Sequence, residues 1–205
     1  MQITLSSAGK RFSREWIFRN LSYDFLPGAK YAVTGPNGSG KSTLLQVLCG
    51  SLLMNEGNCA WQLDGRLIEP DNVHLHISIA APYLELVEEM TAREMLLFHD
   101  NFKKFISGFT IEQILQEANL LHAADKQIRF FSSGMKQRLK LAQSIFSDVP
   151  VVLLDEPCTN LDTSGFELYY QWINTYCSNR LVIISSNDKN EYSFCAEEIN
   201  MLSFK

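Results

Sequence analysis

A glycine-rich loop at residues 35–43 has the residue types that bind phosphate. It follows an apolar stretch ending at Thr34 and precedes a segment whose apolar residues are typical of a helix buried against a sheet. Glycines let successive backbone N–H groups point at phosphate oxygens, and the following helix adds the positive end of its dipole. We expect Lys41 to contact the β- and γ-phosphates of a nucleotide and the Ser42 hydroxyl to ligate Mg²⁺. The expected phosphate-binding residues are Gly35, Pro36, Asn37, Gly38, Ser39, Gly40, Lys41, Ser42 and Thr43.

Two acidic residues, Asp155 and Glu156, follow the apolar run at residues 151–154. Ligands of α/β sheets bind at the carboxyl ends of the strands. We therefore expect Asp155 to hold the magnesium through water, and Glu156 to orient or deprotonate the attacking water. If the chain lacked the glycine-rich loop at residues 35–43, which we call the phosphate loop, two solvated acids at a strand end would explain this pattern equally well.

The elements that must position these residues follow from the hydrophobic pattern. The N-terminal third predicts strands at residues 3–5, 17–25 and 31–34. Residues 91–143 carry helical signals, including the capping-box spacing of Thr91 and Glu94. Apolar runs at 151–155 and 180–185, separated by a helical stretch at 163–177, indicate a βαβ unit of strands buried on both faces. No internal repeat or flexible linker separates these parts, so the helical block reads as an insertion in one α/β domain.

Composition narrows the class of protein. The chain has 205 residues and a net charge of −5, which argues against broad electrostatic binding to nucleic acid or an anionic membrane. No apolar run is long enough to cross a bilayer, and the N-terminus does not resemble a secretion signal, so we expect a cytoplasmic protein. The five cysteines show no CxxC spacing, which favours reduced thiols over disulfides or a zinc site.

Two further segments carry a family resemblance. Phe131-Ser-Ser-Gly-Met-Lys-Gln-Arg138 lies between the phosphate loop and the acidic strand, and Asn160-Leu-Asp162 lies after it. In this order and spacing they resemble the signature segment and D-loop of ATP-binding cassette (ABC) ATPases. The resemblance covers nearly the whole chain, and the signature is far more specific to the family than the phosphate loop is.

The resemblance implies an α/β fold of the P-loop NTPase class. A RecA-like core at about residues 1–82 and 146–205, with an antiparallel β-subdomain, would hold an inserted helical subdomain at about 83–145, all in one ABC ATPase domain over 1–205. It also implies a head-to-tail dimer with a second ABC subunit, in which ATP and Mg²⁺ lie between one phosphate loop and the other signature segment. Ser132 and Gly134 would form the second phosphate cradle.

Adenine recognition is also assigned by the resemblance. Phe12 matches the aromatic residue that stacks on the adenine, and nearby Trp16 is a competitor for that role. The alternative for Phe12 is packing in the core.

Three segments of the chain depart from the family pattern. The stretch at 79–83 lacks the usual glutamine, and Asn187 stands where a histidine usually contacts the γ-phosphate. In the signature, Ser133 and Met135 replace a glycine and a glutamine. The signature departure is mild. The two missing γ-phosphate contacts indicate slow or partner-dependent turnover in an ATPase that keeps Lys41, Ser42, Asp155 and Glu156.

The function that the resemblance implies is the ATP-binding and ATP-hydrolysing subunit of a multi-subunit ABC transporter. It would power movement of an unknown substrate through transmembrane permease subunits that are separate chains, at the inner face of the cell membrane. The permease is expected to dock on apolar residues of the helical subdomain: Tyr83, Leu84, Met95 and Phe98. The alternative is a soluble, non-transporter ABC protein that uses ATP binding as a conformational switch. A kinase or GTPase needs no signature segment.

Two further groups of residues, two histidines and four basic residues, are interpreted as surface or packing residues. His74 and His76 lie on one face of an expected strand, but no third metal ligand is near them in the sequence. The basic residues Lys10, Arg11, Arg14 and Arg19 are expected to form a solvated face.

Overall fold

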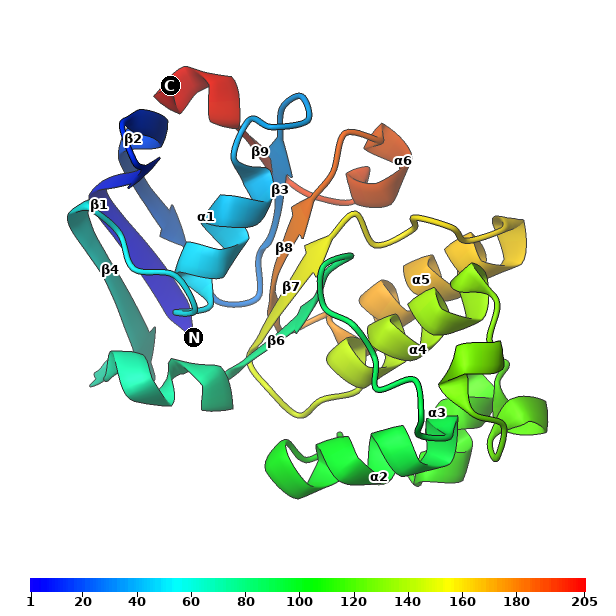
Figure 1. Ribbon diagram of the computed structural model, residues 1–205. Helices are drawn as coiled ribbons and strands as arrows, with labels where there is room; N and C mark the ends of the chain where they lie inside the picture. Colours follow the sequence, from blue (N-terminus) through cyan, green and yellow to red (C-terminus); the bar gives the residue numbers. More distant parts are fainter. The chain divides into compact units, whose positions relative to one another are not determined.

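Two units make up the chain in the computed structural model, which describes residues 1–205 (Figure 1). The first comprises Met1–Ile79, Val149–Glu156 and Asn179–Lys205, and the second comprises Ala80–Asp148 and Pro157–Ser178. The second unit therefore includes residues beyond the helical insertion expected at 83–145, and the boundaries of that insertion remain a prediction.

An antiparallel sheet in the first unit has the strand order β2-β1-β4-β5. Its strands are β1 (Gln2–Phe12), β2 (Glu15–Phe25), β4 (Glu56–Leu63) and β5 (Arg66–Ile68). The first strand is much longer than the sequence pattern indicated, because bulges interrupt its alternation of buried and exposed residues. One bulge lies between Leu5 and Ala8, where Ser7 has a φ of 47°.

The second sheet has the order β6-β7-β8-β3-β9, and the glycine-rich loop follows the end of β3. Its strands are β3 (Lys30–Thr34), β6 (Ile77–Ala80), β7 (Val151–Asp155), β8 (Leu181–Ser185) and β9 (Glu197–Asn200). The pairings β7·β8, β8·β3 and β3·β9 are parallel. Every residue of β7 and β8 is buried, as their continuous apolar sequences predict. Helix α1 (Lys41–Leu48) packs against both of these strands.

Helices dominate the second unit: α2 (Ala92–Phe102), α3 (Ile111–Glu117), α4 (Ser133–Ile145) and α5 (Thr163–Tyr176). A short α6 (Lys189–Tyr192) belongs to the first unit. Short 3₁₀ turns complete the two units: η1 (Pro70–Leu75), η2 (Leu121–Ala123), η3 (Ile128–Phe130) and η4 (Met201–Phe204).

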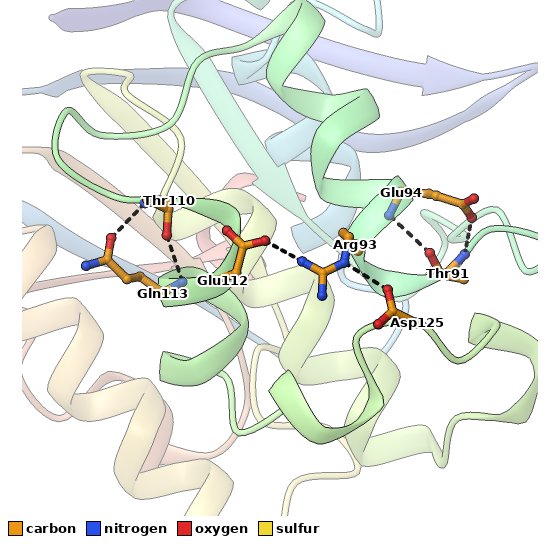
Figure 2. Close-up of polar contacts among 7 residues, drawn as sticks. All are labelled: Thr91, Arg93, Glu94, Thr110, Glu112, Gln113 and Asp125. Atoms are coloured by element: carbon orange, nitrogen blue, oxygen red, sulfur yellow. Dashed lines mark hydrogen bonds and ion pairs between the residues drawn. The ribbon is translucent and has the colours of Figure 1, made fainter.

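Capping boxes begin both α2 and α3 (Figure 2). The Thr91 hydroxyl accepts from the N–H of Glu94, whose carboxylate accepts from the N–H of Thr91 in return. The sequence predicted this pair, and the structure confirms it. Arg93 then ties α2 to its surroundings, because its guanidinium pairs with Glu112 on α3 and, over 2.8 Å, with Asp125.

His99 joins α2 to α4 through a hydrogen-bonded chain. Its Nδ1 accepts from the Gln143 amide over 2.8 Å, so the ring proton lies on Nε2 and is donated to the Ser147 hydroxyl over 2.8 Å. That hydroxyl donates in turn to the carbonyl oxygen of Gln143. The ring stacks on Phe105, and burial lowers the pKa of His99 to about 4. A neutral histidine is therefore part of the packing between these two helices.

Three expectations from the sequence are wrong. Met95 is buried, because it shares the inner face of α2 with Ala92 and Leu96. His74 lies in the 3₁₀ turn η1 and not in a strand. Lys10 is buried rather than solvated, and its ammonium donates to the carbonyl oxygen of Leu53 over 2.7 Å.

Two other features concern the cysteines and the apolar character of the helices. All five cysteines are free, and three of them are buried. No helix in the structure has both the length and the apolar character that a membrane span requires.

Candidate nucleotide site

The glycine-rich loop follows β3 directly and ends where α1 begins at Lys41. The N–H of Ser39 donates to the carbonyl oxygen of Pro36 over 3.0 Å, which closes a tight turn at the tip. Gly38 has a φ of 78° in this turn, a conformation that glycine adopts without strain. The structure thus forms the strand, loop and helix that the sequence predicted.

The base of the loop packs closely on its neighbours. Gly40 has a φ of 103°, and a Cβ atom there would lie 2.5 Å from Cγ2 of Ile17 on β2. Met201 also lies next to Gly40, with its Cε 3.6 Å from the same position. Only glycine fits at position 40. Sequence reasoning missed Ile17, because no local pattern shows that β2 passes under the loop.

A cavity of about 370 Å³ opens over this loop. It brings together the positive Lys41 and the negative Glu156, which are far apart in the sequence. Lys41 is buried, and its Nζ donates to the carbonyl oxygen of Gly35 over 2.8 Å. The lining residues are Ile17, Asn37, Gly38, Gly40, Lys41, Ser42, Thr43 and Glu156. Gly35, Pro36 and Ser39 belong to the loop but not to the cavity lining.

Asp155 is the last residue of β7 and is 2% exposed. Its Oδ1 has no hydrogen-bond partner in the structure, which is rare for a buried carboxylate oxygen. A cation with oxygen ligands would satisfy it. Glu156 comes next, and its N–H donates to the carbonyl oxygen of Ser185 over 2.8 Å.

Asn187 lies close to the phosphate loop. Its Nδ2 donates to Oδ1 of Asn37 over 3.0 Å. Asn37 follows β3 and Asn187 follows β8, which are neighbouring parallel strands. The residue that replaces the usual histidine is therefore bonded to the loop itself.

Phe12 ends β1 with 48% of its surface exposed, so it does not pack in the core. The ammonium of Lys10 lies 5.0 Å from its ring centroid. The ring is not part of the cavity lining. Trp16, its competitor, stacks against the guanidinium groups of Arg11 and Arg19, at 5.4 and 4.5 Å from its ring.

The signature segment forms a second, separate site in the second unit. A cavity of about 230 Å³ is lined by Ser132, Ser133, Gly134, Met135, Arg138, Asn160, Leu161 and Asp162. Sequence reasoning assigned no role to Arg138, whose buried Nε has no partner. That nitrogen and the start of α4 bring positive charge to the cavity, and the carboxylate of Asp162 brings a negative charge.

Hydrogen bonds and close packing fix the signature cavity. The Ser132 hydroxyl caps α4 by accepting from the N–H of Met135. A Cβ atom at Gly134 would lie 2.9 Å from the carbonyl oxygen of Asn160, so the two loops touch backbone to backbone. The carboxylate of Asp162 caps α5, and its bond from the N–H of Gly165 lowers the pKa of Asp162.

Comparison with known proteins places these sites in context. The family model described as "ABC transporter" matches residues 18–159. A lantibiotic transport ATP-binding protein of Streptococcus pyogenes is 28% identical over 98% of this chain and 86% of its own length. An uncharacterized ABC transporter ATP-binding protein of Bacillus subtilis is 28% identical over 94% and 88%. ABC transporter A family member 8 of Arabidopsis thaliana is 28% identical, but this chain spans only about a fifth of its length, 21%.

Solved structures agree on the fold. A bacterial Atm1-family ABC exporter with ATP bound superposes with a TM-score of 0.82 at 20% identity, over 97% of this chain and 37% of the exporter chain. An ATP-binding subunit of an ABC transporter superposes with a TM-score of 0.83 at 18% identity, over 98% and 85%.

Proposed function

Because the chain belongs to the ABC transporter family, we propose that it is the ATP-binding and ATP-hydrolysing subunit of a multi-subunit transporter. The cavity shared by Lys41 and Glu156 is the observation that carries this proposal. A phosphate loop and an acidic group in one cavity can bind a nucleoside triphosphate and activate a water next to it. The transported substrate is determined by the membrane subunits.

ATP fits the cavity through its phosphates. Backbone N–H groups of the glycine-rich loop surround the phosphate chain, except at Pro36, which has none, and at Ser39, whose N–H donates to the carbonyl oxygen of Pro36. The ammonium of Lys41 exchanges the carbonyl oxygen of Gly35 for phosphate oxygens. Phe12 stacks on the adenine. Its exposure supports this role, whereas the guanidinium groups of Arg11 and Arg19 already contact the ring of Trp16.

Mg²⁺ fits beside the phosphates. The Ser42 hydroxyl lines the cavity, and the unpartnered Oδ1 of Asp155 is the kind of hard oxygen ligand that this ion prefers. When bound, Mg²⁺ neutralises charge on the phosphate oxygens. Glu156 holds and deprotonates the water, with its backbone fixed by Ser185.

A second ABC subunit completes the site in a head-to-tail dimer. The signature cavity supports this, because Ser132, Gly134 and the buried Nε of Arg138 provide donors suited to an anion. One chain has half of each composite site: its phosphate loop serves one ATP, and its signature segment serves the other.

Permease subunits dock on the second unit, which places the protein at the inner face of the cell membrane. Tyr83, Leu84 and Phe98 support this, since each leaves at least 40% of its surface exposed. Beside Leu86 lies a cavity of about 320 Å³, lined by two acids, Glu85 and Glu88, and two bases, Lys136 and Lys140. Lys136 pairs with Glu88, so the charges of this cavity are balanced.

The test has two parts. First, Mg-ATP binding and phosphate release are measured for the wild type and for Lys41→Ala, which must bind at least tenfold more weakly. Second, the native protein is purified from gently solubilised membranes and from the soluble fraction, and its partners are identified by mass spectrometry. A stoichiometric polytopic partner supports the transporter. A purely soluble protein that still binds ATP supports the alternative, a conformational switch.

A further inference from the structure

We propose that Asn187 is a positioning residue that acts on the nucleotide through Asn37, by fixing the side-chain amide of Asn37 at the phosphate loop. This inference rests on the proposed function and deepens it. Its basis is the 3.0 Å hydrogen bond from Nδ2 of Asn187 to Oδ1 of Asn37, together with the place of Asn37 in the cavity lining.

The direction of this hydrogen bond determines what Asn37 offers a ligand. Because its Oδ1 accepts from Asn187, its Nδ2 occupies the other branch of the amide and keeps two N–H donors. An amide turned the other way would present an acceptor oxygen, which repels phosphate oxygens. In the structure, the bond from Asn187 thus holds Asn37 in the orientation that suits a phosphate chain.

Asn187 has a backbone suited to this role, since both of its neighbours are anchored. The N–H of Ser186 donates to the carbonyl oxygen of Val33 over 3.2 Å, and Ser186 itself is buried. The N–H of Asp188 donates to the Ser186 hydroxyl over 2.9 Å, and Asp188 caps α6. The Asn187 backbone is thus held between two fixed points at the end of β8.

Asn37 is held in a similar way. It is the second residue of the turn closed by the bond from Ser39 to Pro36. Its side chain is exposed at the tip of the loop, where only a partner can restrict its rotation. The bond from Asn187 supplies that restriction before the nucleotide arrives, which lowers the entropic cost of binding.

A double-mutant cycle tests this role on the full-length protein, with Mg-ATP as the probe in isothermal titration calorimetry. The variants are Asn187→Ala, Asn37→Ala and their combination, and Asn72→Ala is an exposed asparagine control in the same unit. We expect Asn187→Ala to weaken Mg-ATP binding about three- to tenfold, on the scale of one hydrogen bond. In the Asn37→Ala background the same change has no further effect. In steady-state turnover, Asn187→Ala raises KM and leaves kcat within about twofold.

Two results overturn the inference while leaving the proposed function intact. If Asn187→Ala binds Mg-ATP with wild-type affinity, Asn187 has no role in nucleotide binding. A loss that persists in the Asn37→Ala background, with a lower kcat, means that Asn187 contacts the reacting phosphate directly. If the wild type and Asn72→Ala both fail to bind Mg-ATP, the proposed function fails, and this inference fails with it. Unchanged thermal unfolding of each variant shows that the differences do not come from misfolding.

Discussion

The N–H of Glu156 donates to the carbonyl oxygen of Ser185 over 2.8 Å, and Glu156 has a φ of 46°. Left-handed backbone costs a residue other than glycine about 1 kcal/mol, and it occurs often at functional sites. β8 therefore holds Glu156 in a strained conformation, with Glu156 at the edge of the cavity that contains Lys41. A strained conformation persists only where neighbouring contacts fix it, and here the hydrogen bond to Ser185 does so.

Glu156→Gln keeps the shape of the side chain and removes its basicity. We expect phosphate release to fall about 10²- to 10³-fold, while Mg-ATP affinity stays within about threefold. Single-turnover phosphate release and calorimetry measure the two quantities. Glu69→Gln, an exposed acid of the same unit, is the control. Wild-type release by Glu156→Gln would show that Glu156 is not the base.

The variants Phe12→Ala and Trp16→Ala are expected to have opposite effects on Mg-ATP affinity and on stability. Phe12→Ala removes a half-exposed ring, so it weakens Mg-ATP binding about tenfold or more and changes stability by less than about 0.5 kcal/mol. Trp16→Ala removes the ring that packs between Arg11 and Arg19, so it lowers the free energy of unfolding and leaves ATP affinity unchanged. Calorimetry and urea unfolding on both variants decide which ring stacks on adenine. If instead Trp16→Ala loses Mg-ATP affinity and Phe12→Ala does not, Trp16 is the ring that stacks on the adenine.

Gly134→Ala tests the signature site. The new Cβ atom would lie 2.9 Å from the carbonyl oxygen of Asn160, so the two loops must separate. We expect the ATP-dependent dimer, trapped in the Glu156→Gln background, to weaken at least tenfold while each chain still binds ATP. Light scattering after gel filtration measures the dimer, and Ser107→Ala, at an exposed serine of the same unit outside the cavity, is the control. A stable dimer of Gly134→Ala would contradict the signature cavity as the second half of the site.

Tyr83→Asp and Leu84→Asp introduce charge on the expected docking face. Both side chains are exposed, so the isolated protein keeps its stability within about 0.5 kcal/mol. We expect the fraction of the protein bound to membranes to fall at least fivefold in sedimentation assays. Leu53→Asp, at a residue 81% exposed in the first unit, provides the comparison. Unchanged membrane binding would exclude this face as the permease contact.

His99 makes stability depend on pH. Its pKa lies at about 4 in the folded protein and near 6.5 in the unfolded chain, because burial lowers it and Lys103 adds to the effect, although Asp100 opposes it. As pH falls, the unfolded chain binds the proton before the folded protein does. The contribution of neutral His99 to the free energy of unfolding is therefore fully present above pH about 6.5 and is lost as the pH falls from there to about 4. Allowing for partial solvent exposure, we expect about 2 kcal/mol.

Urea unfolding at pH 7.5 and 4.5 measures this effect. His99→Gln should lose about 2 kcal/mol less than the wild type between the two pH values, since every other group titrates in both proteins. His122→Gln, at an exposed histidine, should behave like the wild type. If His99→Gln and the wild type lose the same free energy of unfolding between pH 7.5 and 4.5, His99 has the same pKa in the folded protein and in the unfolded chain.

The fold and the phosphate loop could be predicted because their signals are local. The continuous apolar runs of β7 and β8 require burial on both faces, and the loop motif has its glycines at fixed spacing. The burial of Met95 could also have been predicted, because Ala92, Met95 and Leu96 are spaced three and four residues apart along α2 and form its buried face. Its apolar character alone wrongly suggested a surface role.

Other features depend on contacts between distant segments, which the sequence pattern does not encode. Ile17 lies under Gly40 because β2 passes the loop, and Lys10 is buried because the carbonyl oxygen of Leu53 accepts its ammonium. The bond between Asn187 and Asn37 also joins positions far apart in the chain. The sequence showed only that a histidine was missing there, and not which partner the asparagine takes.

The strand order of the parallel sheet has a consequence for how the protein is made. β3 lies between β8 and β9, so residues 30–34 pair only with residues that are synthesised much later, at 181–185 and 197–200. Pairings between such distant segments form slowly. On the ribosome, the antiparallel sheet of β1, β2 and β4 can fold early, whereas β3 must wait for the C-terminal strands. The nascent chain is therefore expected to fix the glycine-rich loop after β3 as one of its last folding events.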